Sequence, residues 1–375
     1  MSARAGAAAL ATALLFSIGC AGLSLSEMPA SPIAIRYLDP EQDRRARQAL
    51  ADRREASRQR RDGGLPDTRR GVAVLRDIEQ FFRGSLGPDR GVSKWRNRRE
   101  PDERSPRLAL IDPRTGTLEL MPEARPGSIP VAWSADRQRL MFGQIQRGYP
   151  QLFEIDLESR EVRPLTHEPG AHPWGCYGPE GRIVVETHHY RERGFRSLIE
   201  ISSPGGGRFQ ELTPGPADSR PSCAPNGSAI AYVSKSRFAT PASAKRRQGT
   251  REQRPQIVVR APETGGESAI VGPGIDPSFT PDSRQILYSA PQRVTSERGV
   301  ETRWRLRRAR VSGLGRGGFG TGSIDEVEPT VSPDGRIVAF VGIDADLHNT
   351  LYVRRIDGSG ERILFNHGAA LGPIW

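Results

Sequence analysis

All the histidines of this chain fall in segments that a repeating pattern predicts to emerge on one side of the fold. The six are His167, His172, His188, His189, His348 and His367. Each lies after the second or the fourth of four short strands that recur along the sequence. Imidazole can ligate a metal or exchange a proton near neutral pH. This side is therefore where a binding or catalytic site is expected.

Four titratable or charged residues come immediately before the prolines that mark successive repeats: His172, Arg220, Asp276 and Glu328. In two further copies Ile129 and Gly372 hold this position. We expect the set to rim the central axis on the histidine-bearing side. Such a ring could bind a polar or charged protein partner or a metal, but polar loops also collect these residues without any role. We predict a partner-binding rim at the four residues, with no catalytic residue, metal site or cofactor assigned.

The repeat is marked by a proline that precedes an aromatic or apolar anchor in six copies. The anchors at 133, 177, 223, 279, 331 and 375 are 44, 46, 56, 52 and 44 residues apart. In the fifth copy a Pro333-Asp334-Gly335 turn separates short apolar strands at 330–332 and 337–341, and 350–356 and 362–365 complete the unit. Four short antiparallel strands in a unit of this length are typical of a propeller blade.

The final copy contains only Pro373-Ile374-Trp375, whereas residues 107–121 predict a third and fourth strand without a first. A C-terminal strand that completes this blade would close the ring and remove its free edge. No obvious second strand is seen for it, so we expect three strands there. The prediction is an all-β, six-bladed β-propeller over residues 107–375, about 45 residues per blade. A solenoid or a sandwich with regular turns is the alternative.

The Ser-Pro-Asp-Gly turn at 332–335 and the Leu-Thr pairs at 165–166 and 212–213 resemble the TolB-type, WD-repeat-like β-propeller repeat. The α/β amino-terminal domain of TolB itself has no counterpart in the Arg-rich residues 36–106. The resemblance implies a propeller whose mouth binds a partner protein. Similar repeats in oligogalacturonate lyases bind a catalytic metal through His, but here no second repeat position supplies a matching ring of His.

Residues 1–20 predict a signal peptide, with Arg4 before the apolar run at 7–18. The sequence Ser17-Ile18-Gly19-Cys20 resembles a bacterial lipobox, which predicts lipidation of Cys20. Ordinary signal-peptidase cleavage is the alternative, and both place the protein outside the cytoplasm. We predict a periplasmic lipoprotein that is anchored to a bacterial membrane, with the outer membrane as the favoured one.

Residues 21–106 are predicted to be a helical, Arg-rich linker segment. Asp39-Pro40 is a favourable helix start. A second helix is expected at 72–83, where an apolar stripe could pack on the propeller or fill a partner's groove. Residues 84–106 have the composition of a linker.

The formal net charge is +11, but 52 of the 55 basic residues are Arg, as a GC-rich coding bias produces. Together with export, this argues against nucleic acid as a partner. Cys176 and Cys223 are expected in or beside inner strands of neighbouring blades, as small core residues or as a disulfide. The segments 236–255 and 291–303 are predicted as long loops between second and third strands.

No Gly-x-Ser-x-Gly motif occurs, and the glycine pattern at 313–318 has no following helix to receive a pyrophosphate. We therefore predict a monomeric binding or scaffold protein of the cell envelope, held by its lipid anchor, with a protein partner. The alternative is a metal-dependent, lyase-like envelope enzyme that acts on an acidic polysaccharide.

Overall fold

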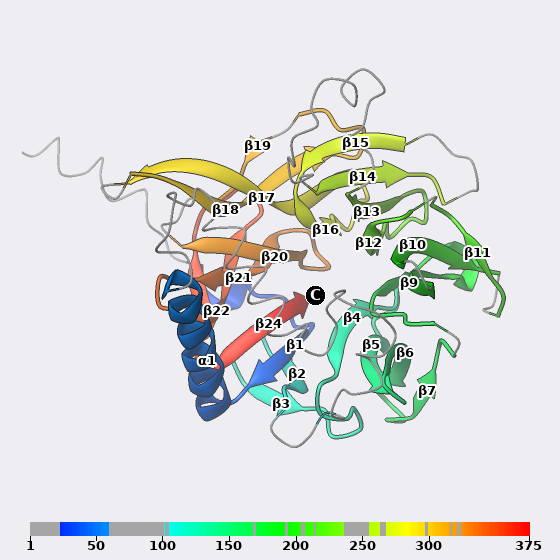
Figure 1. Ribbon diagram of the computed structural model, residues 1–375, viewed down its shortest axis with the longest axis horizontal. Coiled ribbons are helices and arrows are strands. Elements are labelled where there is room, and N and C mark those ends of the chain that lie inside the picture. Colours follow the sequence, from blue (N-terminus) through cyan, green and yellow to red (C-terminus); the bar gives the residue numbers. More distant parts are fainter. Residues whose placement is uncertain are drawn as a thin grey trace, which may run out of the picture.

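A computed structural model describes residues 23–59, 101, 105–167, 170–191, 194–203, 207–213, 215–235, 255–262, 268–296, 299–315, 317–320 and 324–375. These residues form six four-stranded antiparallel sheets around one axis (Figure 1). The predicted six-bladed β-propeller is confirmed. The strands form from segments in which apolar residues alternate or follow one another without interruption. The apolar side chains of neighbouring blades pack into shared buried clusters.

The strands of the first five blades follow the chain in order, from the central axis outwards. Blade 1 contains β4 (Ile129–Trp133), β5 (Arg139–Gln146), β6 (Tyr149–Asp156) and β7 (Val162–Pro164). Blade 2 contains β8 (Gly175–Tyr177), β9 (Ile183–Arg191), β10 (Gly194–Ser202) and β11 (Phe209–Glu211). Blade 3 contains β12 (Asp218–Cys223), β13 (Ile230–Ser234), β14 (Gln256–Arg260) and β15 (Ser268–Pro273).

The fourth and fifth blades repeat this order. Blade 4 contains β16 (Ile275–Phe279), β17 (Gln285–Ser296), β18 (Gly299–Arg310) and β19 (Gly317–Gly318). Blade 5 contains β20 (Asp325–Val331), β21 (Ile337–Ile343), β22 (Asn349–Arg355) and β23 (Arg362–Phe365). The segment 291–303, predicted as a loop, lies largely in the paired extension of β17 and β18. Most of the other predicted insertion, 236–254, lies outside the described residues.

Blade 6 closes the ring with strands from both ends of the chain. Its order is β24 (Ala369–Ile374), β1 (Ile33–Leu38), β2 (Arg107–Ile111) and β3 (Leu118–Leu120). The expected closure by the C-terminal strand is confirmed. The expectation of only three strands in this blade is wrong, because β1 supplies the second strand between β24 and β2. One propeller strand therefore lies outside the 107–375 range, within the segment predicted as helix and linker.

The turns between first and second strands in blades 1, 4 and 5 share one hydrogen-bond pattern. In blade 5 the Ser332 hydroxyl donates to Asp334 Oδ1 at 2.5 Å and accepts from the Ile337 amide at 2.9 Å. Ser134 and Thr280 make the corresponding side-chain bond in blades 1 and 4. A short hydroxyl or carboxylate side chain can satisfy turn amides locally, which explains the repeated Ser/Thr-x-Asp.

The helix α1 (Pro40–Gln59) begins at Asp39, whose carboxylate accepts bonds of 2.9 Å from the amides of Glu41 and Gln42. The predicted helix start is thus confirmed. Ala46 and Leu50 are buried in a cluster that includes Leu347 of blade 5. The helix sits in the connection from β1 to β2, so this segment is inserted within blade 6. The predicted helix at 72–83 and residues 1–22, with Cys20, lie outside the described residues.

No helix in the described part of the chain is both long and apolar enough to cross a membrane. A disulfide links Cys176 in β8 to Cys223 in β12, with the Cα atoms 5.7 Å apart. Of the two possibilities left open for these cysteines, the structure therefore has the disulfide. It joins the inner strands of blades 2 and 3.

Candidate functional site

We name the side that carries the second-to-third and fourth-to-first strand connections the mouth face. His167 and His172 lie between β7 and β8, His348 between β21 and β22, and His367 between β23 and β24. His188 and His189 lie within β9, rather than after it as predicted, because the β9–β10 hairpin is longer than expected. The insertion that contains α1 belongs to the same class of connection, as does the β17–β18 tip.

The backbone of the predicted rim has a repeated irregularity. Arg220, Asp276, Glu328 and Gly372 have φ of 53°, 54°, 53° and 56°. Each lies at a register shift in the innermost strand of its blade. Left-handed backbone at a non-glycine residue is uncommon and persists where its surroundings hold it. Four of the six predicted rim positions therefore have the same kind of bulge, each in its own blade. Ile129 and His172 do not have positive φ.

Arg220 connects three blades. Its guanidinium forms an ion pair with Asp276, and the two side chains are 16% and 8% exposed. The same guanidinium carbon lies 5.1 Å from the centre of the Trp174 ring. The Arg220 backbone amide donates to Glu186 Oε2 at 2.9 Å. The charges of Arg220 and Asp276 are thus compensated within the protein.

Glu186 extends this network to a histidine. Its Oε1 lies 2.5 Å from His188 Nε2, and both side chains are largely buried. Glu186 comes from the second strand of blade 2, whereas Arg220 is on the first strand of blade 3. We name His188, Glu186, Arg220 and Asp276 the rim network. Of its members, the sequence singled out Arg220 and Asp276 as rim residues.

His172 is 5% exposed and stacks on Phe209, with ring centres 6.0 Å apart. Its Nδ1 lies 3.2 Å from the Thr187 hydroxyl, which donates to Glu200 Oε2 at 2.5 Å. Burial, together with the nearby His188 and His189, lowers the pKa of His172 to about 4. His172 is therefore a neutral, packed side chain at pH 7.

Glu328 connects blades 4, 5 and 6. Its carboxylate accepts a bond of 2.7 Å from the Gly372 amide, and its own amide donates to the Ser289 hydroxyl at 3.2 Å. Burial lowers the pKa of Arg36 on β1 to about 10, and the negative charge of Glu328 acts in the opposite direction. Like the rim network, this arrangement uses predicted rim residues to hold neighbouring blades together.

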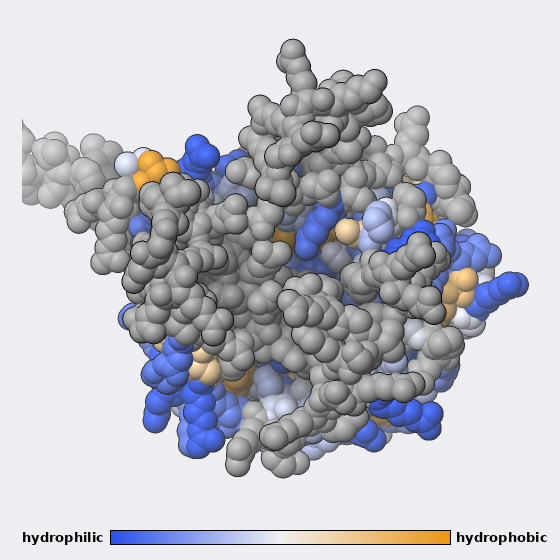
Figure 2. Space-filling view, viewed as in Figure 1, coloured by the Kyte–Doolittle hydropathy of each residue, from blue (hydrophilic) through white to orange (hydrophobic). Residues whose placement is uncertain are grey.

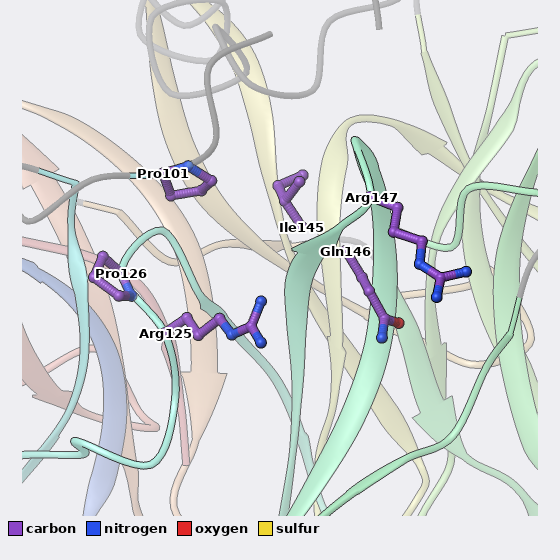
Figure 3. A pocket seen from close by; sticks show the side chains of 6 residues that line it. All are labelled: Pro101, Arg125, Pro126, Ile145, Gln146 and Arg147. Atoms are coloured by element: carbon purple, nitrogen blue, oxygen red, sulfur yellow. The ribbon is translucent and has the colours of Figure 1, made fainter. Parts of the chain in front are cut away.

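A pocket of about 460 Å³ opens on the mouth face between blades 6 and 1 (Figure 3). Its walls come from Pro101, from the connection between β3 and β4, and from the end and turn of the β5–β6 hairpin. They are Pro101, Arg125, Pro126, Ile145, Gln146 and Arg147. This site could not be predicted from the sequence, because nothing in the sequence distinguishes these two arginines from the other 50 before the fold places them at one cavity.

The described surface on the side shown in Figure 2 is mostly hydrophilic, with small separate hydrophobic areas. Among the residues that the structure describes, no group of three or more His, Cys, Asp or Glu side chains is placed to hold a metal ion. The rim residues are thus paired within the protein, whereas the exposed arginines of the pocket are open to a polar or charged partner.

No protein-family model matches the chain, and a search of curated proteins finds no match. Solved structures are similar in fold. A putative TolB from Agrobacterium tumefaciens has 19% identity and a TM-score of 0.54, covering 70% of this chain and 89% of that one. TolB from Acinetobacter baumannii has 15% identity and a TM-score of 0.57, covering 83% and 74%.

A structure of a nidogen/laminin complex also matches, with 11% identity, a TM-score of 0.51, and coverage of 72% of this chain and 94% of that one. The similarity therefore extends to propellers in unrelated settings, and it concerns the arrangement of blades. The chain has the six-bladed β-propeller fold of the TolB type.

Proposed function

We propose that the protein is an exported, lipid-anchored binding protein of the cell envelope, and that its mouth face binds a protein partner. The proposal rests mainly on one observation: the long connections between strands lie on that face. The α1 insertion of blade 6 and the long β17–β18 hairpin of blade 4 extend there, whereas short turns connect strands on the opposite face. Binding surfaces are commonly built from such segments on a rigid scaffold.

The resemblance of the repeats to TolB-type propellers, whose mouths bind partner proteins, supports this proposal. The fold-level similarity to two TolB structures agrees with it. The Cys176–Cys223 disulfide supports export, because disulfides persist in oxidising compartments outside the cytoplasm. Together these observations favour the periplasm.

The lipid anchor is tested at Cys20, the acylation site that the sequence predicts. Cys20→Ala should move the protein from the membrane to the soluble periplasmic fraction, with the signal peptide still directing export. A variant that stays in the membrane fraction would contradict the anchor. Metabolic labelling with a palmitate analogue provides a second measurement that does not depend on fractionation.

The partner-binding face is tested by photo-crosslinking in intact cells. A crosslinking amino acid at Glu41 or His348, both on the mouth face, should trap a defined partner. The same group at Ser159 or Arg208, in turns on the opposite face, is the control. Capture from the opposite face alone would contradict the assignment.

The enzyme alternative is tested with the purified protein, by measuring its metal content and its activity. Stoichiometric metal that is lost in His172→Ala, together with turnover of a polyuronate, would favour a lyase-like enzyme over a binding protein.

A further inference from the structure

We infer that the pocket between blades 6 and 1 binds carboxylate side chains of an acidic polypeptide segment. This inference rests on the proposed function, since it names the chemistry of the partner that the mouth face would bind. The pocket is separate from the rim network. Among the residues that the structure describes, its lining presents two guanidinium groups and one amide, and no carboxylate.

The two arginines of the pocket differ from three nearby arginines of blade 1, which form ion pairs. Arg139 and Arg163 pair with Glu154, and Arg160 pairs with Glu119. Arg125 and Arg147 are exposed and form no ion pair with any residue that the structure describes. A guanidinium group offers a planar fork of donors that matches a carboxylate. Two such groups at one cavity therefore favour an anionic ligand.

The backbone under both arginines is well held. The Arg125 amide donates to Gln144 Oε1 at 3.2 Å, and its carbonyl accepts from the Ser128 hydroxyl at 2.7 Å. Arg147 and Gly148 form the two-residue turn of the β5–β6 hairpin, with φ of 50° and 83°. Positive φ at both central residues is typical of a tight hairpin turn. The positions from which the two side chains extend are thus set before any ligand arrives, which lowers the entropic cost of binding.

The remaining walls favour a peptide over a sugar polymer. Pro101, Pro126 and Ile145 are apolar and suit the aliphatic part of an acidic peptide. A uronate also needs acceptors for its hydroxyl groups, and within the described lining only the Gln146 amide offers a side-chain acceptor. Figure 3 shows Arg125 on the loop before β4, facing the end of the β5–β6 hairpin that carries Ile145, Gln146 and Arg147.

The test uses the full chain purified from cells and a fluorescein-labelled peptide, Pro-Glu-Ala-Glu-Pro, with its Pro-Gln-Ala-Gln-Pro counterpart. Fluorescence anisotropy should show binding of the Glu peptide, weakened by salt, and at least tenfold weaker binding of the Gln peptide. Arg125→Gln and Arg147→Gln should each weaken binding about tenfold, the effect of one lost charge-assisted bond pair. Arg208→Gln, at an exposed arginine on the opposite face, should bind like the parent protein.

Equal affinity of the parent and both pocket variants would overturn the inference, as would tighter binding of oligogalacturonate than of the Glu peptide. A tenfold gain in Asp102→Asn/Glu103→Gln would also overturn it, because carboxylates of the chain itself would then be the occupants. Circular dichroism confirms that each variant is folded. If the peptide does not bind but mouth-face crosslinking still traps a partner, only this inference fails and the proposed function stands.

Discussion

The carboxylate of Glu328 accepts a hydrogen bond of 2.7 Å from the backbone amide of Gly372. The two residues lie at corresponding positions in the first strands of blades 5 and 6, and both have left-handed backbone. Glu328 also acts electrostatically on the buried Arg36 of β1. One carboxylate therefore stabilises both β24 and β1, the two strands that close the ring.

Replacement of Glu328 separates its hydrogen bond from its charge. Glu328→Ala should lower the free energy of unfolding by about 2 kcal/mol, because it removes the acceptor and a charge that favours buried Arg36. Glu328→Gln keeps an amide oxygen for Gly372 and should lose about half as much. Urea unfolding of the two variants measures this difference. Equal losses would mean that the hydrogen bond to Gly372 contributes nothing beyond the charge, whereas an unchanged stability of Glu328→Gln would mean that the charge contributes nothing.

Trp375 should be a major contributor to closure. It is 7% exposed, its indole donates to the Ser31 carbonyl at 3.0 Å, and its amide donates to Thr330 Oγ1 at 2.9 Å. Trp375→Ala should cost about 3–5 kcal/mol in urea unfolding, the range for a buried Trp. Leu314→Ala is the control, since Leu314 is 66% exposed, and should stay within about 0.5 kcal/mol. A loss in Trp375→Ala as small as that of the control would show that closure does not depend on this side chain.

The Arg220–Asp276 pair should contribute more to stability than to partner binding. Removal of one member of a largely buried ion pair leaves an uncompensated charge, so Asp276→Leu should cost about 3 kcal/mol. Arg220→Met/Asp276→Leu should be less destabilised than the sum of the single variants. The double-mutant cycle is measured by urea unfolding. An additive cycle, with partner capture lost in both single variants, would instead assign the pair to the binding surface.

His172 should make the protein less stable in acid. Its folded-state pKa, about 4, lies below the ordinary value of 6.5, so the unfolded chain binds more protons between these two values. This contribution to stability is fully present above pH 6.5 and is lost as the pH falls towards 4, by about 3 kcal/mol in total.

The measurement for His172 compares urea midpoints of the parent and His172→Gln from pH 7.5 to 4.5. Thr187 contacts the imidazole and donates to Glu200, and His188 and His189 act on it electrostatically. The variant should be less stable at pH 7.5 but should lose less stability on acidification. An unchanged pH slope would assign the acid sensitivity to other groups.

The rim shows where sequence reasoning succeeded and where it stopped. Arg220, Asp276 and Glu328 were expected to rim the central axis, and the structure has each of them in the innermost strand of its blade. Each of these residues lies at a register shift and bonds to a neighbouring blade. Both features depend on packing between strands about 40–55 residues apart in the chain, which is the repeat length. A partner-binding rim was predicted at these residues, and the ion pair between Arg220 and Asp276 is a contact that the sequence did not indicate.

The blades and their closure could be predicted from the sequence, because each proline, turn and apolar run is a local signal that recurs with the period of a propeller unit. The place of Ile33–Leu38 between β24 and β2 is visible only in the folded chain. No turn connects β1 to β24 in the chain, and 68 residues separate β1 from β2, so its pairing has no local signal. The pocket of Arg125 and Arg147 also depends on packing, since the β3–β4 connection and the β5–β6 turn line one cavity only in the folded propeller.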